Sequence, residues 1–256
     1  MKPFDRKYIG LVLEIAYCQF KLKDQSTLLG FLWSFLHPLL ILFVFLAFFK
    51  ERIGKEIDHY TIFMLIGILH YTHFANSTAS SMTTLSRMRQ LTRNVILPKE
   101  LLVLGSVLAF SLEFVLSMTI CVAVAYFSGV QPSWTISAIP LIFFLQILMT
   151  MWVSLLLSCI HVFIPDIAHV YQVFLRILLF TTPVFYTASF LGTGTARFIV
   201  LLNPLAQVIE FSRSILLKST PFPFTHFFTF IVVNVFLNYI CFKLFKKFEP
   251  GMVERA

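Results

Sequence analysis

Six apolar stretches follow one another along the chain, and each is long enough to cross a lipid bilayer. A helix needs about 20 apolar residues to span a hydrocarbon core of about 30 Å, and only a helix satisfies its own backbone hydrogen bonds there. The stretches cover residues 28–49, 60–82, 101–127, 137–163, 170–190 and 222–242. This pattern predicts an all-α integral membrane protein with six transmembrane helices, forming one domain over residues 1–256.

The segment before the first stretch has helical periodicity of its own. Glu14 interrupts its apolar run and no small-residue cleavage site follows, so the segment is not typical of a signal peptide. We therefore expect residues 1–27 to form an amphipathic helix in the cytoplasmic interface, followed by an inner gate. The apolar positions of this helix are Phe4, Tyr8, Leu11, Val12 and Ile15.

Residues 191–218, between the fifth and sixth stretches, are too numerous for a tight turn and too apolar for a free loop. Asn203 and Pro204 break the chain, and helical periodicity then runs from Leu205 to Leu216. We expect two short re-entrant helices that dip into the outer leaflet as an outer gate. Such an element is tolerated only where it is buried in protein or lines a cavity.

Composition excludes a soluble globular protein, because 58% of the residues are hydrophobic and only 12% are charged. The net charge of +8 lies in short clusters between apolar runs, so we expect no nucleic-acid partner. Thirteen Lys and Arg residues lie in the two terminal segments and the second loop, against six on the opposite side. This excess predicts that both termini are cytoplasmic.

Motifs for catalysis, nucleotide binding and metal binding are missing from the sequence. No G-x-x-x-x-G-K-[ST] occurs, so the chain has no phosphate loop for ATP. His70 and His73 share a helix face, but no carboxylate or cysteine in that stretch completes a metal site. His161, Asp166 and His169 are explained by a cytoplasmic turn and a helix cap. We expect no catalytic residue, metal or cofactor in this chain.

Two ionisable residues lie within apolar stretches, Glu113 in the third and Arg176 in the fifth. Each costs roughly 2.5–3.5 kcal/mol at the bilayer centre on insertion scales, so each is expected to face protein or water. One interpretation is a polar pathway or an interhelical pair. The alternative is that Arg176 extends to the cytoplasmic headgroups, which its depth allows.

Several short motifs, in order along nearly the whole chain, carry a family resemblance. Gly30, Trp33 and Pro38 form a Gly-x-x-Trp-x-x-x-x-Pro pattern at the first stretch, and a basic loop ends in Pro98-Lys99-Glu100. The remaining motifs are Pro165-Asp166-Ile167, Thr182-Pro183-Val184-Phe185-Tyr186 and Asn203-Pro204-Leu205. With these motifs the chain resembles permease subunits of bacterial O-antigen and other polysaccharide ABC exporters, although Pro165 replaces the Arg usual in that family.

The resemblance implies a homodimer in the bacterial inner membrane, bound to two copies of a separate ABC ATPase subunit. ATP and Mg would bind that partner, so this chain would not itself be an enzyme. The cargo would be a lipid-linked polysaccharide moved from cytoplasm to periplasm.

The resemblance also assigns roles to individual residues. ATPase coupling falls to Arg87, Arg89, Arg93, Asn94 and Pro98. The inner gate and headgroup site comprises Lys21, Lys23, Gly30, Trp33 and Pro38. The outer gate comprises Asn203, Pro204, Glu210 and Arg213. Aromatic rings stack on sugars, and the candidates for lining a channel are Phe31, Phe35, Phe180, Phe185 and Tyr186.

Other functions remain open at this point. A teichoic-acid, capsule or drug exporter would use the same scaffold. An intramembrane glycan-modifying enzyme would be active as an isolated chain, without an ATPase partner. An ungated channel is disfavoured, because each subunit has too few polar positions to line a wide pore.

Overall fold

The protein is an assembly of helices. The computed structural model describes residues 6–23, 32–52, 54–94, 97–130, 137–187, 198, 200, 202–217 and 224–255, and no strand occurs among them. The first helices are α1 (Arg6–Lys23), α2 (Trp33–Phe49), the short 3-10 helix η2 (Gly54–Glu56), α3 (Tyr60–Arg87) and α4 (Arg89–Asn94). They are followed by α5 (Glu100–Phe127), α6 (Ile139–Phe163), α7 (Ile167–Thr181), α9 (Pro204–Leu217) and α10 (Phe224–Arg255).

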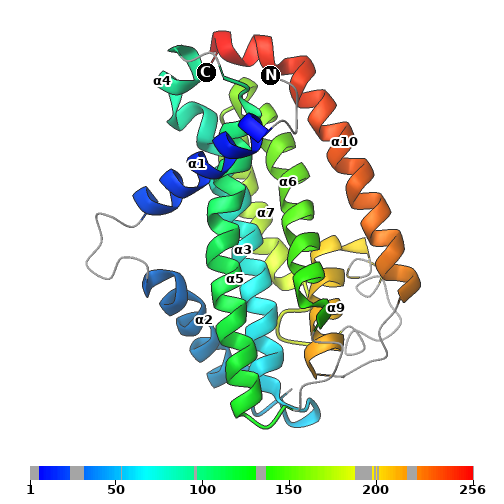
Figure 1. Ribbon diagram of the computed structural model, residues 1–256. Helices are drawn as coiled ribbons and strands as arrows, with labels where there is room; N and C mark the ends of the chain where they lie inside the picture. Colours follow the sequence, from blue (N-terminus) through cyan, green and yellow to red (C-terminus); the bar gives the residue numbers. More distant parts are fainter. Residues whose placement is uncertain are drawn as a thin grey trace.

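Helices α3, α5 and α6 pack against one another and form the centre of a bundle (Figure 1). α10 runs along α6 on one side, and α2 lies against α3 on the other. The shorter helices α7 and α9 pack on α3, and α9 also contacts α6. Because α3 packs against α2, α5, α6, α7 and α9, it is the element around which the others are placed.

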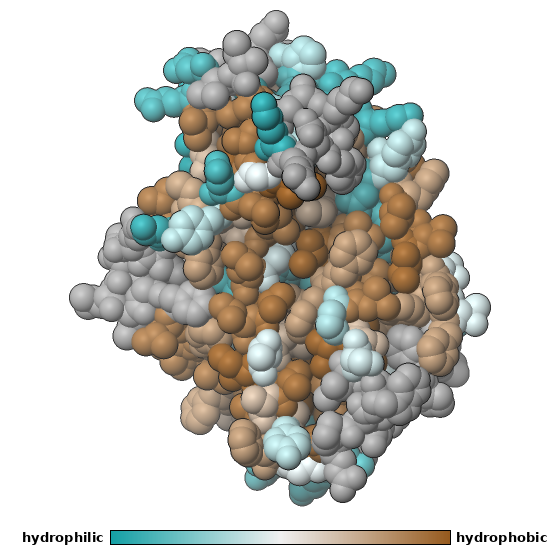
Figure 2. Space-filling view, in the orientation of Figure 1, coloured by the Kyte–Doolittle hydropathy of each residue, from teal (hydrophilic) through white to brown (hydrophobic). Residues whose placement is uncertain are grey.

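On the face drawn in Figure 2, apolar residues cover the middle of the molecule, and hydrophilic residues gather at one end, around α4 and the last turns of α10. Within the part of the chain that the structure describes, three helices are long and apolar enough to cross a membrane: α5, α6 and the Phe224–Met252 part of α10. They correspond to the third, fourth and sixth expected spans. The molecule is thus an all-helical integral membrane protein.

The other expected spans are also helical, with different bounds. α2 and α7 are shorter apolar helices of 17 and 15 residues. The fifth span was expected to continue to residue 190, but α7 ends at Thr181. Pro183 follows, and it restricts the residue before it to an extended backbone, as the φ of −91° and ψ of 134° at Thr182 show.

The N-terminal helix α1 is docked on α5. Tyr8, Val12 and Ala16 are buried, while Leu11, which was expected on the apolar face, is exposed. Gly105 of α5 permits the close approach, since a Cβ built there would lie 2.5 Å from Cγ2 of Ile15. The buried face of α1 is therefore set by the surface of α5.

Charged groups join α1, α5 and α10 at the hydrophilic end. The Lys246 ammonium lies 2.7 Å from the Glu100 carboxylate and 3.0 Å from that of Glu249. Tyr8 donates to Glu100, and the Lys99 backbone N–H donates to Glu249. Burial and the adjacent Glu100 raise the pKa of the Tyr8 phenol, whereas burial lowers the pKa of Lys99 against the opposing effect of Glu249. This charged cluster fixes both ends of the chain to the start of α5.

Replacing Gly105 by alanine tests the docking of α1. The added methyl group meets Ile15, so we expect overpacking to lower the free energy of unfolding by about 1–3 kcal/mol. Gly10→Ala is the matched control: nothing lies within 4 Å of a Cβ there, and the change stabilises a helix by up to about 1 kcal/mol. Unfolding midpoints of the purified chain in detergent measure both effects. Equal midpoints for the two variants would contradict the docking.

Candidate functional site

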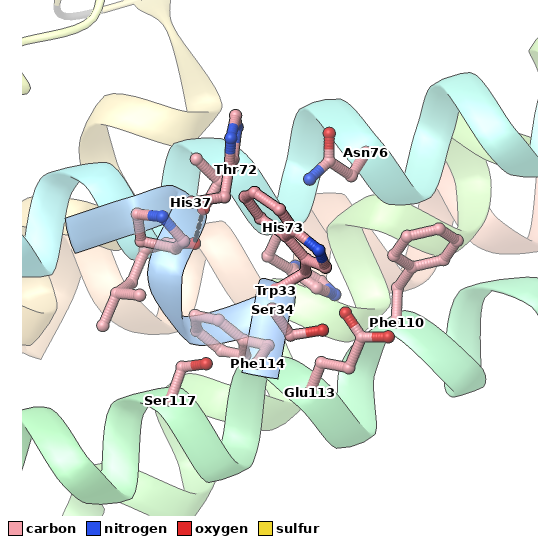
Figure 3. Close-up of a pocket in the computed structure, with 12 residues that line it drawn as sticks. Trp33, Ser34, His37, Thr72, His73, Asn76, Phe110, Glu113, Phe114 and Ser117 are labelled. Atoms are coloured by element: carbon pink, nitrogen blue, oxygen red, sulfur yellow. Dashed lines mark hydrogen bonds between the residues drawn. The ribbon is translucent and has the colours of Figure 1, made fainter. Parts of the chain in front are cut away.

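A pocket of about 140 Å³ opens between α2, α3 and α5 (Figure 3). α2 contributes Trp33 and Ser34, α3 contributes His73 and Asn76, and α5 contributes Glu113. The side chains of Ser34 and Glu113 point toward one another across the pocket (Figure 3). Glu113 is only 8% exposed, so its carboxylate lies inside the bundle.

Arg176 does not share this pocket. It lies exposed on α7, whereas Glu113 lines the pocket on α5. No ion pair joins these two residues in the described part of the chain. Their environments are separate, and only Glu113 is placed among polar groups from several helices.

A chain of buried hydrogen bonds leads from the pocket to α9. Ser212 of α9 lies 2.7 Å from Nε2 of His70, whose Nδ1 is 3.1 Å from the side-chain oxygen of Gln146. The Gln146 amide nitrogen lies 3.1 Å from Nδ1 of His73, and Nε2 of His73 lies 3.3 Å from Ser111. This network connects α9, α3, α6 and α5.

The donors and acceptors of this network determine its direction. The Gln146 oxygen only accepts, so Nδ1 of His70 donates to it, and in the neutral imidazole Nε2 then accepts from the Ser212 hydroxyl. The Gln146 amide donates to Nδ1 of His73, so Nε2 of His73 donates to Ser111, which itself donates to the Val107 carbonyl. Each imidazole thus carries one proton and has both nitrogens engaged. Within the described residues, no group of His, Cys, Asp or Glu is placed to hold a metal ion.

Arg213, one residue further along α9, is completely buried. Its guanidinium donates to the carbonyls of Phe63, Pro183 and Val184 at 2.6–3.2 Å. Its Cζ also lies 3.4 Å from the centroid of the Phe63 ring. Gly67 leaves the necessary space, since a Cβ there would lie 2.8 Å from a guanidinium nitrogen. Arg213 therefore ties α9 to α3 and to the turn after α7.

The other expected outer-gate residues lie at the start of α9. The Asn203 side chain accepts from the Leu205 backbone N–H at 3.0 Å and donates to Thr182 at 2.8 Å. Pro204 occupies the first helical position, which suits its fixed φ. Glu210 is half-buried on the same helix. Asn203 thus caps α9 and connects it to the end of α7.

The expected coupling residues divide between two environments. Arg87 turns back to Ser80 at 3.1 Å, and it lines a second pocket of about 300 Å³ between α1, α3 and α5. Arg89 and Asn94 are exposed on α4, and Pro98 is half-buried before α5. Arg93 belongs to α4, but its side chain lies outside the described part.

Trp33 and Pro38 meet at the polar pocket, Trp33 43% exposed and Pro38 buried. Lys21 is exposed near the end of α1. The Lys23 side chain, Gly30 and Phe31 lie outside the described residues. The structure therefore describes only some of the residues predicted for the inner gate.

The expected channel aromatics have different exposures. Phe185 is buried and stacks on Phe49 and Phe45 at centroid distances of 4.8 and 5.3 Å. Tyr186 is also buried and donates to the Phe180 carbonyl. Phe35 is half-buried, and Phe180 is 62% exposed. Among these four, Phe180 is the ring that the subunit leaves most accessible.

Comparison with known proteins agrees with this geometry. The family described as ABC-2 type transporter matches residues 13–217, which is most of the chain. The protein belongs to the ABC-2 type transporter family. Its described helices and buried polar groups are accordingly those of a membrane-spanning transporter component.

Similar ABC-2 transporter proteins include O-antigen export system permease proteins named RfbA. The Myxococcus xanthus protein is 28% identical over 210 residues, covering 82% of this chain and 81% of the relative. Two Klebsiella pneumoniae proteins of the same name are 26% and 25% identical over 211 and 200 residues. They cover 82% and 78% of this chain, and 81% and 77% of their own lengths.

Sequence reasoning missed three important positions in this ABC-2 transporter subunit. Gln146 and Ser212 are polar residues whose partners are 76 and 142 residues away along the chain. Glu100 belongs to the Pro-Lys-Glu motif but was given no role. An acidic residue in the first turn of a helix is a signal that was available, because it interacts favourably with the helix dipole.

Replacing Arg213 by lysine tests its anchoring role in this ABC-2 transporter subunit. Lysine keeps the charge but lacks the planar fork that reaches several carbonyls together. We expect the free energy of unfolding to fall by about 1.5–3 kcal/mol. Arg176→Lys, an exposed change on α7, is the control and should have an effect within about 0.5 kcal/mol. Unfolding midpoints in detergent measure both effects. An Arg213→Lys protein with the midpoint of the native chain would contradict the anchoring role of Arg213.

Proposed function

We propose that this chain is the transmembrane subunit of an ATP-driven exporter that moves lipid-linked O-antigen or a similar polysaccharide from cytoplasm to periplasm. The observation that carries the proposal is the similarity to three O-antigen export permeases across about four-fifths of both chains. The ABC-2 family match over residues 13–217 gives the same class of machine. The sequence has no phosphate loop, so ATP and Mg are assigned to a separate ABC ATPase subunit.

In the proposed assembly, two copies of this chain bind two ATPase subunits. Each copy crosses the inner membrane six times, through α2, α3, α5, α6, α7 and α10, with both termini in the cytoplasm. The positive-inside excess in the N-terminal segment, the second loop and the C-terminal segment supports this orientation. α9 belongs to the re-entrant outer gate, and the buried Arg213 supports this, since re-entrant backbone requires burial in protein.

Reconstitution tests the proposed function directly. The chain and its proposed ABC ATPase partner are purified together and placed in vesicles with lipid-linked polysaccharide on the ATPase side. We expect ATP-dependent delivery of glycan to the opposite side. Transport of teichoic acid or a drug but not of O-antigen would support the alternative exporters. Glycan modification by the isolated chain would overturn the transport proposal.

Arg89 is the sharper test of ATPase coupling. Because Arg89 is exposed on α4, Arg89→Glu replaces attraction to a polar or acidic groove of the ATPase by repulsion. We expect about tenfold weaker ATPase binding, with a matching loss of coupled ATP hydrolysis. Arg52→Glu, an equally exposed change in the turn after α2, should leave both unchanged. Co-purification and hydrolysis assays compare the two, and equal loss in both variants would count against a specific coupling surface.

A further inference from the structure

The pocket between α2, α3 and α5 combines one carboxylate with neutral polar groups and aromatic rings. Glu113 supplies the carboxylate, and Asn76 supplies an amide. The remaining polar lining consists of the hydroxyls of Ser34, Thr72 and Ser117 and the imidazoles of His37 and His73. Trp33, Phe110 and Phe114 supply ring faces. The pocket thus offers hydrogen bonds and stacking surfaces together.

Glu113 lies deep along α5. It follows Glu100, the first residue of α5, by 13 positions, which places it about 20 Å along the helix axis. An ionisable group at such a depth in a spanning helix carries a large insertion cost and is by default a functional candidate. Hydrogen bonds donated to the Glu113 carboxylate reduce this insertion cost.

We propose that this pocket binds one sugar residue of the exported glycan. A pyranose ring has apolar C–H faces that pack on an indole and hydroxyl edges that donate to carboxylates and amides. Trp33 is 43% exposed, so its ring is accessible, and Glu113 and Asn76 reach the same pocket from α5 and α3. The inference rests on the proposed function and adds a specific contact site for the cargo.

The chemistry of the pocket disfavours other small ligands. Among the described residues that line it there is no Lys or Arg, and a carboxylate repels phosphate. An ammonium ion would be attracted to Glu113, but it would leave most of the neutral donors and acceptors without a role. A ring bearing several hydroxyls uses both kinds of group.

The second pocket, next to the proposed sugar site, contains the positively charged side chain of Arg87. Arg87 and Gln19 line that second pocket, and Phe110 lines both pockets. A phosphate near Arg87 would therefore have the next part of the cargo close to Trp33 and Glu113. This order matches a lipid-linked glycan, in which sugar follows phosphate.

Tryptophan fluorescence of the full-length chain in lipid nanodiscs tests the proposal. The probes are methyl glycosides of neutral hexoses, deoxyhexoses and N-acetylhexosamines, with butylammonium chloride and inorganic phosphate as contrasts. We expect at least one glycoside to give a saturable change that is absent from Trp33→Phe. Glu113→Gln should weaken its apparent affinity about tenfold, and Asn76→Ala should weaken it as well.

Glu14→Gln is the matched control, because Glu14 is an exposed acid on α1, and it should bind like the native chain. Gel filtration and the helical signal in circular dichroism show whether each variant is folded. If Glu113→Gln does not fold, Asn76→Ala provides the test. The inference is overturned if no glycoside gives a saturable response. It is also overturned if only butylammonium gives a saturable response. A glycoside affinity in Glu113→Gln and Asn76→Ala equal to that of Glu14→Gln would overturn it as well.

The export assay separates this inference from the proposed function. Glycan export by the native complex without any glycoside response would overturn the sugar site and leave the exporter in place. Saturable glycoside binding at Trp33 without glycan export would support the sugar site and count against the exporter.

Discussion

Hydrogen bonds between α3 and the helices around it are the interaction on which the bundle depends, although the buried hydroxyls of Ser77 and Ser81 on the same helix have no hydrogen-bond partner within the described structure. Water is absent from a bilayer core, so each polar group left unpaired there costs several kcal/mol. α3 carries His70 and His73, and its Phe63 carbonyl accepts from Arg213. Its partners come from α5, α6 and α9. Removing α6 or α9 would leave more than one of these buried groups on α3 without its partner, and removing α5 would take Ser111 away from His73.

Hydrogen bonds also connect regions that are proposed to act at different depths. The network from Ser212 through Gln146 to His73 links α9 to the wall of the polar pocket. Arg213 links the same helix to the turn after α7. At the hydrophilic end, Glu100 and Lys246 join α1, α5 and α10.

Local patterns in the sequence predicted most helices, and they predicted the break at Asn203 and Pro204, because hydrophobic length and chain-breaking residues act over short distances. The end of α7 at Thr181 was missed, since Pro183 was taken as part of an apolar run. The docking of α1 on Gly105 was missed for a different reason. It depends on the shape of a surface about 90 residues away along the chain, and periodicity alone does not show which apolar side chains that surface covers.

The crossing of the membrane by α3 is the central claim, because this helix is less apolar than α5 and α6 and its buried polar groups are paired by the neighbouring helices. Its flanks are tested by placing single cysteines at Asp58 and Arg89 in a chain with its four native cysteines replaced. An impermeant maleimide is then applied to spheroplasts. The account predicts labelling at position 58 in intact spheroplasts and at position 89 only after permeabilisation. Labelling of both positions from the same side would contradict it.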